Sequence, residues 1–370
     1  MSNKLRVLCV HPALAPYRVD LFNVLSEHVD LTVVFLQENL QTQNINQAEV
    51  RKEIKFTYLF ALRGFSFKGR IFRFGLNKII NEICPDVVIG FEFSPTTLSL
   101  CLFREIGLGR KYKLWTTTDD RVAQIVATRG LRKIFRNFIL RHVDGCIVTD
   151  NSVAYALKSA IARIDRLMFA AIPIVHDTEM IRVNETSVLG RGERWRMSLD
   201  LASNEKIMLF VGRLVPIKNL QWLIAQMVQV PKYVRLVVVG DGCKELELKR
   251  IVSEQSLSDR VKFVGRREGE LLYAVMSAAD VLVLCSHSET YGAVVAEALQ
   301  WGVPCLVNDR CGASVILNEK NGRVFRYNDS EDFRSKLNEV LVLPKGKLSL
   351  LPVDLRQSVL TLVEMMHEDA

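Results

Sequence analysis

Two acidic and two basic residues in the second half of the chain have the types and the spacing needed to bind an anionic, hydroxylated ligand. Glu289 and Glu297 are separated by seven residues, and Arg213 and Lys218 stand in an earlier turn. Carboxylates accept hydrogen bonds from hydroxyl groups, whereas an arginine fork and a lysine ammonium bind phosphate oxygens. Taken singly, each of these side chains is more simply a solvated surface charge. Together they suit a ligand that carries both a diphosphate and hydroxyl groups.

The elements around the two glutamates form a compact unit. The apolar run 281–285 predicts a buried strand, residues 292–302 predict a helix, and a second strand starts at Val303. In parallel α/β sheets, ligands collect at the carboxyl ends of strands, where helix N-termini offer unpaired N–H groups. We therefore expect Glu289, in the turn, and Glu297, in the helix, to face one crevice.

Strand and helix patterns alternate in two series along the chain. The first opens with strands at 5–10 and 29–36 around a helix at 19–27, and the second restarts with a strand at 207–211. The polar residues 37–51 are expected to form a loop or a weakly structured insert. The pattern breaks around residues 172–177, and a polar, arginine-rich stretch to Asp200 follows, so we place a domain boundary there. The prediction is an α/β protein with two Rossmann-like parallel-sheet domains facing each other across a cleft.

Bulk composition fits this organisation. The chain has 370 residues, of which 49% are hydrophobic, and this is enough apolar material for two domains of roughly 150 to 200 residues each. The net charge of +8 favours acidic partners such as phosphates, nucleic acids or anionic lipids without choosing among them.

Cysteine usage and hydropathy predict the compartment. The eight cysteines are scattered singly and show no CxxC spacing, which is typical of buried thiols in a reducing cytosol. The first apolar run is too short for a secretory signal, and charges or turn residues interrupt the later ones well before membrane-spanning length. We expect a cytoplasmic protein, with any membrane contact peripheral, at the inner face of the membrane.

A series of motifs follows in fixed order between residues 205 and 330. They are Phe210-Val-Gly212-Arg213-Leu-Val-Pro-Ile-Lys218-Asn219, Val239-Gly240-Asp241-Gly242, Val261-Lys-Phe-Val-Gly265, Ala279-Asp280, and Glu289-x7-Glu297-Ala298-x3-Gly302-x-Pro304. The series resembles glycosyltransferase family 4, the retaining nucleotide-sugar transferases of the GT-B fold. The N-terminal half, with Pro16-Tyr17-Arg18 and Pro85-Asp86-Val-Val-Ile, is similar but looser, as an acceptor domain would be.

The resemblance implies a role for each of these residues. Arg213 and Lys218 would hold the leaving diphosphate, Glu289 would contact hydroxyls of the donor sugar, and Glu297 would accept hydrogen bonds from the ribose. Backbone groups of the donor site would come from Gly212, Thr290, Tyr291 and Gly292, and Gly265 and Arg266 would border the base. The acceptor-side candidates are Tyr17, Arg18 and Asp119. Asp119 follows a predicted strand, where it takes a polar role or caps the next helix.

The reaction implied is metal-independent, retaining transfer of a hexose from a nucleotide-diphosphate sugar to a glycan or lipid-linked glycan. No Asp-x-Asp pair occurs in the chain, so no metal ligand and no cofactor is expected beyond the donor itself. A role in cell-surface polysaccharide synthesis would follow. The expected domains are an acceptor domain at 1–175, a donor domain at 176–345, and a helix at 346–370 that packs back on the first domain.

Three positions depart from the family pattern. The first loop is His11-Pro12-Ala13-Leu14-Ala15-Pro16 instead of a glycine-rich turn, Val315 stands where an acid is usual, and residues 115–120 lack a histidine that commonly follows an N-terminal strand. A catalytically silent partner subunit is therefore an alternative. A nucleotide-sugar epimerase of the same fold is another, and the net charge of +8 motivates a third, a nucleic-acid-binding protein, although no nucleic acid is expected as a partner.

Two basic stretches that include aromatic residues have two possible roles, as ordinary surface elements or as a membrane contact. Residues 70–74 and 129–141 interleave phenylalanine with arginine. The helix expected at 131–142 is most simply amphipathic, with Leu131, Ile134, Phe135 and Phe138 on one face and a solvated basic face. The alternative is that one stretch docks on an anionic membrane that carries a lipid-linked acceptor.

Overall fold

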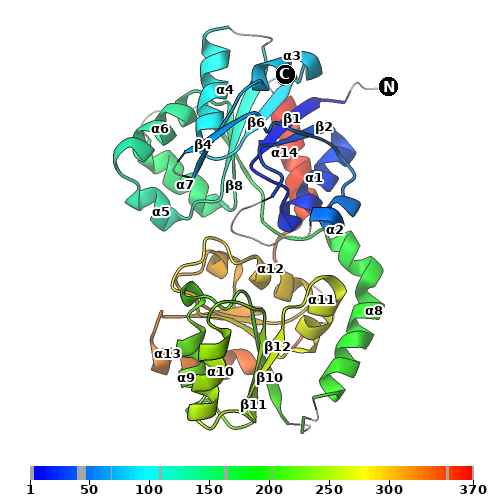
Figure 1. Cartoon of the computed structure of the whole chain (residues 1–370), viewed down its shortest axis with the longest axis vertical. Helices are drawn as coiled ribbons and strands as arrows, with labels where there is room; N and C mark the ends of the chain where they lie inside the picture. The colour runs from blue at the N-terminus through cyan, green and yellow to red at the C-terminus, as the bar shows by residue number, and fades with distance from the viewer. Residues whose placement is uncertain are drawn as a thin grey trace. The chain divides into compact units, whose positions relative to one another are not determined.

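The structure is a computed structural model, and it describes residues 4–39, 47–67, 69–107, 111–161, 166–199, 201–202, 204–346 and 350–368 (Figure 1). The chain divides into two compact units. Unit 1 comprises Met1–Asp177 and Asp354–Ala370, and unit 2 comprises Thr178–Val353. Each unit is built around its own parallel sheet, which confirms the predicted α/β class with two Rossmann-like domains.

Unit 1 contains a seven-stranded sheet in the order β3-β2-β1-β6-β7-β8-β9. The strands are β1 (Arg6–His11), β2 (Asp30–Phe35), β3 (Thr57–Phe60), β6 (Val87–Gly90), β7 (Lys113–Thr118), β8 (Gly145–Val148) and β9 (Met168–Ala171). All neighbouring strands pair in parallel. Every residue of β6 and β8 is buried, as expected for strands covered on both faces.

The helices of unit 1 connect these strands, and a short antiparallel hairpin lies outside the main sheet. The helices are α1 (Pro16–His28), α2 (Gln47–Lys52), α3 (Leu76–Ile83), α4 (Pro95–Glu105), α5 (Val122–Ala127), α6 (Gly130–Arg141), α7 (Asn151–Ala160) and α14 (Leu355–His367). The hairpin pairs β4 (Gly64–Phe67) with β5 (Arg70–Arg73), and α4 packs against β5 and α6. The expectation of a loop at 37–51 is wrong at its end, where α2 forms; residues 40–46 lie outside the described residues.

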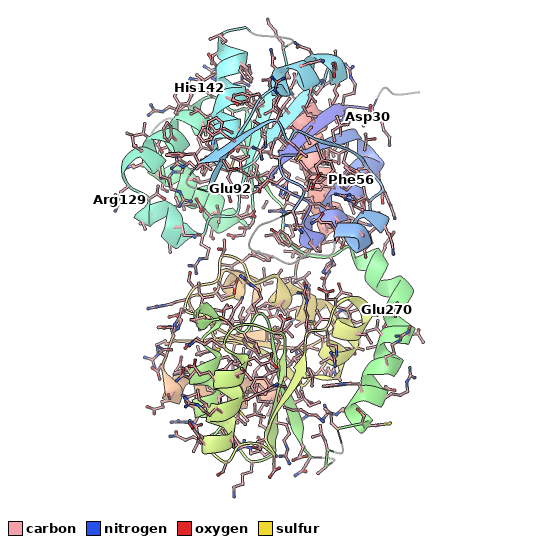
Figure 2. All side chains as sticks on the ribbon, in the orientation of Figure 1. Asp30, Phe56, Glu92, Arg129, His142 and Glu270 are labelled. Atoms are coloured by element: carbon pink, nitrogen blue, oxygen red, sulfur yellow. The ribbon has the colours of Figure 1, made fainter. Side chains whose placement is uncertain are left out.

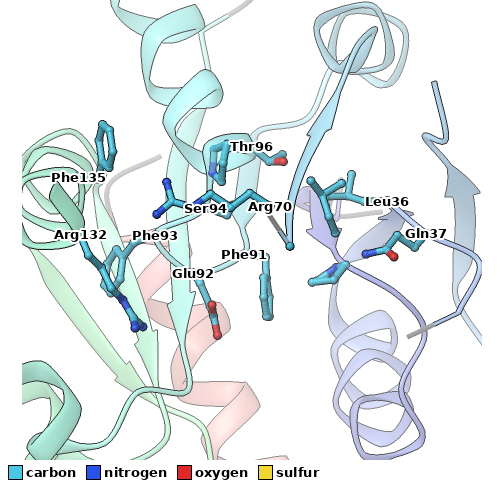
Figure 3. A pocket seen from close by; sticks show the side chains of 14 residues that line it. Leu36, Gln37, Arg70, Phe91, Glu92, Phe93, Ser94, Thr96, Arg132 and Phe135 are labelled. Atoms are coloured by element: carbon cyan, nitrogen blue, oxygen red, sulfur yellow. The ribbon is translucent and has the colours of Figure 1, made fainter. Parts of the chain in front are cut away.

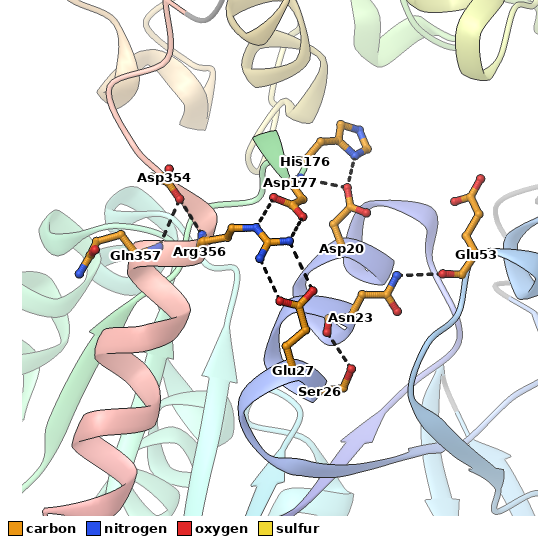
Figure 4. Close-up of polar contacts among 10 residues, drawn as sticks. All are labelled: Asp20, Asn23, Ser26, Glu27, Glu53, His176, Asp177, Asp354, Arg356 and Gln357. Carbon is orange, nitrogen blue, oxygen red and sulfur yellow. Dashed lines mark hydrogen bonds and ion pairs between the residues drawn. The ribbon is translucent and has the colours of Figure 1, made fainter. Parts of the chain in front are cut away.

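The last helix, α14, belongs to unit 1 and packs on α1 and β9. Its first turn is capped by Asp354, whose carboxylate accepts hydrogen bonds from two backbone N–H groups of that turn. Arg356 then bridges two acids (Figure 4). Its guanidinium donates to both carboxylate oxygens of Asp177, at 2.9 and 2.7 Å, and to Glu27 at 2.9 Å. This fork ties the end of the chain to the first helix.

Unit 2 contains a six-stranded parallel sheet in the order β12-β11-β10-β13-β14-β15. The strands are β10 (Lys206–Val211), β11 (Val234–Val239), β12 (Val261–Gly265), β13 (Val281–Leu284), β14 (Cys305–Asn308) and β15 (Gly322–Phe325). The helices are α8 (Thr178–Met197), α9 (Leu220–Gln226), α10 (Glu245–Glu254), α11 (Gly269–Ala278), α12 (Ala293–Gln300) and α13 (Ser330–Leu341), with 3₁₀ turns η1 (Pro216–Lys218) and η2 (Gly312–Ile316).

The arginine-rich stretch before unit 2's sheet, for which no secondary structure was predicted from the sequence, forms helix α8. Helix α8 packs along α11, and Gly192 allows the close approach, because a Cβ at Gly192 would lie 2.7 Å from the carbonyl oxygen of Ala274. Arg196 donates to Ala278 O at 2.8 Å and to Asp280 at 2.9 Å. Hydrogen bonds from a basic side chain therefore help to fix the end of this helix, in addition to its packing along α11.

The Arg356 fork gives a test of what holds α14. Replacing Arg356 by Ala removes an ion pair and two hydrogen bonds from the carboxylate of Asp177, which is only 7% exposed. We expect the free energy of unfolding to fall by about 1–3 kcal/mol, because charge-assisted hydrogen bonds to a buried carboxylate are lost.

Denaturant unfolding of both variants checks the expectation. The control is Arg250→Ala, which removes an exposed pair with Glu254 and should change stability by less than about 0.5 kcal/mol. Equal effects of the two variants would show that the fork does not anchor the helix.

Candidate functional site

Parallel pairing brings the predicted donor residues of unit 2 to one edge of its sheet. β10 pairs directly with β13, with Met208 opposite Val281, so the loops that follow both strands lie side by side. The loop after β10 carries Arg213 and leads into η1, which ends at Lys218. The loop after β13 carries Glu289.

Lys218 and Glu289 form a short ion pair. Their side chains are 17% and 20% exposed, so the pair is largely shielded from solvent. Ser286 donates a further hydrogen bond to the same carboxylate oxygen of Glu289, at 3.3 Å. The structure thus brings together the cation predicted for the diphosphate and the carboxylate predicted for the sugar.

Backbone hydrogen bonds hold these two side chains in place. The N–H of His287 donates to Ile217 O at 2.8 Å, and the side chain of Asn219 donates to Cys285 O at 3.2 Å. Asn219 adopts a left-handed backbone with φ of 56°, a conformation that asparagine tolerates better than most residues. Both bonds connect η1 to the loop after β13. The backbone at Lys218 is therefore fixed beside that loop, and only the side chain of Lys218 keeps its own flexibility.

Helix α12 starts at Ala293, four residues after the turn residue Glu289, with Gly292 as its N-cap. Gly292 has φ of 89°, and a Cβ there would lie 2.9 Å from Cys311 Sγ, so only glycine fits. Glu289 itself is held on both sides of its peptide, since its N–H donates to Arg310 O at 3.3 Å and its carbonyl accepts from Gly312 N at 3.0 Å. This close packing explains the glycine of the Glu-x7-Glu motif.

The other predicted donor residues lie along the same edge, in different surroundings. Thr290 is exposed, Tyr291 is buried and Glu297 is half-buried in α12. Arg266, which follows β12, is exposed and donates to Glu268 at 2.9 Å. Val315, the departure from the family pattern, lies in η2 and is 52% exposed.

Backbone hydrogen bonds at glycines connect the carboxyl ends of β10, β11 and β12. Gly212 N donates to Val239 O at 3.0 Å, and Gly240 N donates to Gly265 O at 3.0 Å. A Cβ on Gly240 would lie 2.0 Å from Gly212 O. These glycines therefore let three strand ends approach each other, while Arg213 projects as an exposed side chain.

In unit 1 the three acceptor-side candidates also come together. Arg18 is 6% exposed, donates to Asp119 at 2.7 Å and lies 5.8 Å from the centre of the Tyr17 ring. Burial acts to lower the pKa of Arg18, but the charge and the hydrogen bond of Asp119 raise it above its usual value. Asp119 pairs with Arg18 and does not cap the next helix, whose N-cap is Arg121.

An acidic residue beside this group, Glu92, was not predicted from the sequence. Glu92 follows β6 (Figure 2). It lines a cavity of about 470 Å³ in unit 1, whose lining side chains are drawn in Figure 3. Burial, Asp119 and Asp120 raise its pKa to about 7, against the opposing charges of Arg132 and Arg18. The available signal was its position, because an acid directly after a predicted parallel strand lies where ligands bind.

Part of the chain, including most of unit 2, is similar to a known protein family. Residues 192–350 match the family described as glycosyl transferases group 1. This stretch therefore resembles a group 1 glycosyltransferase domain. It contains every donor-side residue predicted above, from Gly212 to Glu297.

Curated glycosyltransferases are similar to parts of the chain. The chain is 32% identical over 131 residues to an uncharacterized glycosyltransferase of Methanocaldococcus jannaschii, covering 35% of this chain and 34% of the relative. It is 24% identical over 291 residues to an alpha-monoglucosyldiacylglycerol synthase of Streptococcus pneumoniae, covering 75% of this chain and 65% of the relative. The matches to the first relatives span about a third of those proteins' length.

Solved structures show the same fold along the whole chain. A glycosyltransferase from Rickettsia africae has a TM-score of 0.70 at 16% identity, covering 98% of this chain and 96% of that one. The Anabaena protein HepE, in complex with UDP and glucose, has a TM-score of 0.66 at 16% identity, covering 98% and 95%. At this identity the likeness establishes the GT-B fold.

The surroundings of Glu92 generate a prediction about stability and pH. A raised carboxyl pKa means that the folded chain holds this proton more tightly than the unfolded chain. The contribution to stability is therefore complete below the unfolded pKa of 4.5 and is lost as pH rises through about 7. Replacing Glu92 by Gln removes the loss and should stabilise the protein at pH 8 by on the order of 1–3 kcal/mol.

Unfolding curves at several pH values would show this effect as a difference between variant and wild type that shrinks toward pH 5. Glu105→Gln, which changes an exposed acid on α4, should show no such pH-dependent difference. If the Glu92 variant behaved like this control, burial would not be perturbing the carboxyl group.

Proposed function

We propose that this chain transfers a hexose from a nucleotide-diphosphate sugar to a hydroxyl of a glycan or lipid-linked glycan, with retention of configuration and without a metal ion. The observation that carries the proposal is the pairing of Lys218 with Glu289 at the strand edge of a stretch that resembles a group 1 glycosyltransferase domain. The complexes of HepE with UDP and glucose and with UDP-glucose support a nucleotide-sugar donor. Cell-surface polysaccharide synthesis is the proposed setting.

The donor would be held by charge and by helix α12. Lys218 and Arg213 would neutralise the diphosphate as the bond to the sugar breaks. Since Lys218 is already paired, the phosphates would compete with Glu289 for it, and the released carboxylate could then accept hydrogen bonds from sugar hydroxyls. Glu297 would accept from the ribose, and the first N–H groups of α12 would face oxygens of the donor.

The transfer itself needs no strong base in the protein. The bond between the anomeric carbon and the phosphate oxygen breaks, the acceptor oxygen bonds to the same face of that carbon, and the acceptor proton passes to the departing phosphate oxygen. The protein contributes by orienting the two substrates and by stabilising the negative charge that develops on the diphosphate.

Donor binding provides the first test. UDP-glucose, added with a chelator, should raise the melting temperature of the wild type. Lys218→Ala and Glu297→Ala should weaken donor binding by about tenfold or more, because each removes a charged contact to the ligand. Lys249→Ala and Glu254→Ala, on the surface of α10, are matched controls and should bind like wild type.

The outcomes separate the rival functions. No stabilisation by UDP-, GDP- or ADP-sugars, or equal binding by all variants, would count decisively against a donor site. A new nucleotide sugar formed without any acceptor would identify an epimerase. Donor binding without transfer to any acceptor would indicate a silent subunit, and steeply salt-dependent binding of DNA or RNA would favour a nucleic-acid-binding protein.

We also propose peripheral contact with an anionic membrane, at the inner face of the membrane, through helix α6 of unit 1. The expected ordinary amphipathic helix is wrong at its start, where Leu131 and Ile134 are 68% and 61% exposed. In contrast, Arg136 is 2% exposed and donates to Ile125 O at 2.9 Å. Apolar side chains next to the exposed Lys133 suit an interfacial helix, and no helix in the described ranges is long and apolar enough to span a membrane.

Flotation with phosphatidylglycerol liposomes at low salt tests this contact. The wild type should float, and the double variant Leu131→Ser, Ile134→Ser should lose most of the bound fraction. The control is Leu246→Ser, Val342→Ser, which changes two equally exposed apolar side chains of unit 2. Absence of flotation by the wild type, or equal loss in both double variants, would refute docking by α6.

A further inference from the structure

The cavity of unit 1 has walls of contrasting chemistry. Its volume of about 470 Å³ lies within the usual range for small-ligand sites. The loop after β6 supplies Phe91, Glu92 and Phe93, the hairpin supplies Arg70, and α6 supplies Arg132 and Phe135 (Figure 3). Three aromatic rings thus surround a few charged groups, an arrangement that orients a compact ligand.

The carboxylate of Glu92 has no hydrogen bond and no ion pair to any described residue. Its backbone has φ of 49°, which is uncommon outside glycine and asparagine. Two threonines hold this conformation, because Thr116 Oγ1 donates to Glu92 O at 2.9 Å and Glu92 N donates to Thr117 Oγ1 at 3.4 Å. A strained backbone that presents an acceptor without donors is a feature of ligand sites.

Arg70 is a hydrogen-bond donor for which the described residues provide no acceptor. Within the part of the chain that the structure describes, its guanidinium has neither a hydrogen bond nor an ion pair, and its side chain extends across the cavity toward Ser94 (Figure 3). Arg132, by comparison, already donates to both carboxylate oxygens of Asp120, at 3.0 and 3.2 Å. Arg70 is therefore the cation that a bound oxyanion would meet without displacing a protein partner.

We infer that this cavity binds a sugar carrying an anionic substituent, a phosphate or a carboxylate, as the acceptor of the proposed transfer. Hydroxyl groups of such a ligand donate to Glu92, its oxyanion accepts from Arg70, and the apolar face of its ring covers Phe91 and Phe93. The assignment of the ligand as acceptor rests on the proposed function, whereas the binding itself does not.

Calorimetric titration of the full chain, without any donor, tests the binding. The probes are glucose 6-phosphate, glucuronate, glucose and inorganic phosphate. We expect one or both of the anionic sugars to bind at least about tenfold more tightly than glucose or phosphate alone, because only they satisfy both charged groups. Equal affinity for phosphate and glucose 6-phosphate, or no preference for anionic sugars over glucose, would overturn the inference.

Matched variants locate the binding. Arg70→Met should abolish the preference for the anionic sugars, and Glu92→Ala should weaken them by about tenfold while leaving phosphate binding unchanged. Glu92→Asn, which suits the left-handed backbone, is the second variant if the alanine protein does not fold. The controls Arg63→Met and Glu105→Gln change exposed residues outside the cavity lining and should bind within about twofold of wild type. Wild-type binding by both cavity variants would overturn the inference.

Transfer assays then separate this inference from the proposed function. A chain that binds anionic sugars in the cavity but transfers no sugar from any nucleotide sugar would refute the proposed function and leave the binding site standing. Transfer to an acceptor whose KM is unchanged in Arg70→Met would refute the cavity as acceptor site and leave the transferase standing.

Discussion

The parallel pairing of β10 with β13 is the constraint on which the candidate donor site depends. Lys218 and Glu289 are 71 residues apart in the chain, and they meet because the carboxyl ends of neighbouring parallel strands share one edge of the sheet. The backbone bond from His287 to Ile217 then fixes the two loops against each other. This bond orders the backbones of the two loops, so the ion pair does not have to offset the entropy of ordering both loops by itself.

Unit 1 uses the same arrangement with different residues. β1, β6 and β7 are consecutive in its sheet, and Arg18, Glu92 and Asp119 follow them in turn. One cation therefore lies close to two carboxylates, and it is hydrogen-bonded to only one of them. Burial with a like-charged neighbour is what raises the pKa of the remaining acid, so the unusual state of Glu92 follows from strand order.

Sequence patterns predicted the fold class, and they placed the proposed donor residues at strand ends, because both depend on local signals. A buried parallel strand followed by a glycine and a helix is visible in a short window, as around Glu289. Helix α8 was not predicted because its sequence, rich in polar residues, has no clear apolar period of 3.6 residues. Glu92 was not predicted because its raised pKa depends on Asp119 and its proposed role depends on Arg70. Both residues are distant from Glu92 in the sequence, so a short sequence window does not place them beside it. The exposure of Leu131 likewise depends on packing that periodicity does not report.

The two candidate sites differ in how their charges are satisfied before any ligand arrives. Lys218 and Glu289 already neutralise each other. A diphosphate that bound Lys218 would break this ion pair, so its binding free energy would be reduced by the energy of the lost pair. The side chains of Glu92 and Arg70 have no hydrogen-bonding partners among the described residues, so a ligand that satisfies both breaks no contact between protein groups. Specificity should therefore be sharper in the cavity of unit 1, because a ligand that lacks either group leaves a charged side chain unsatisfied.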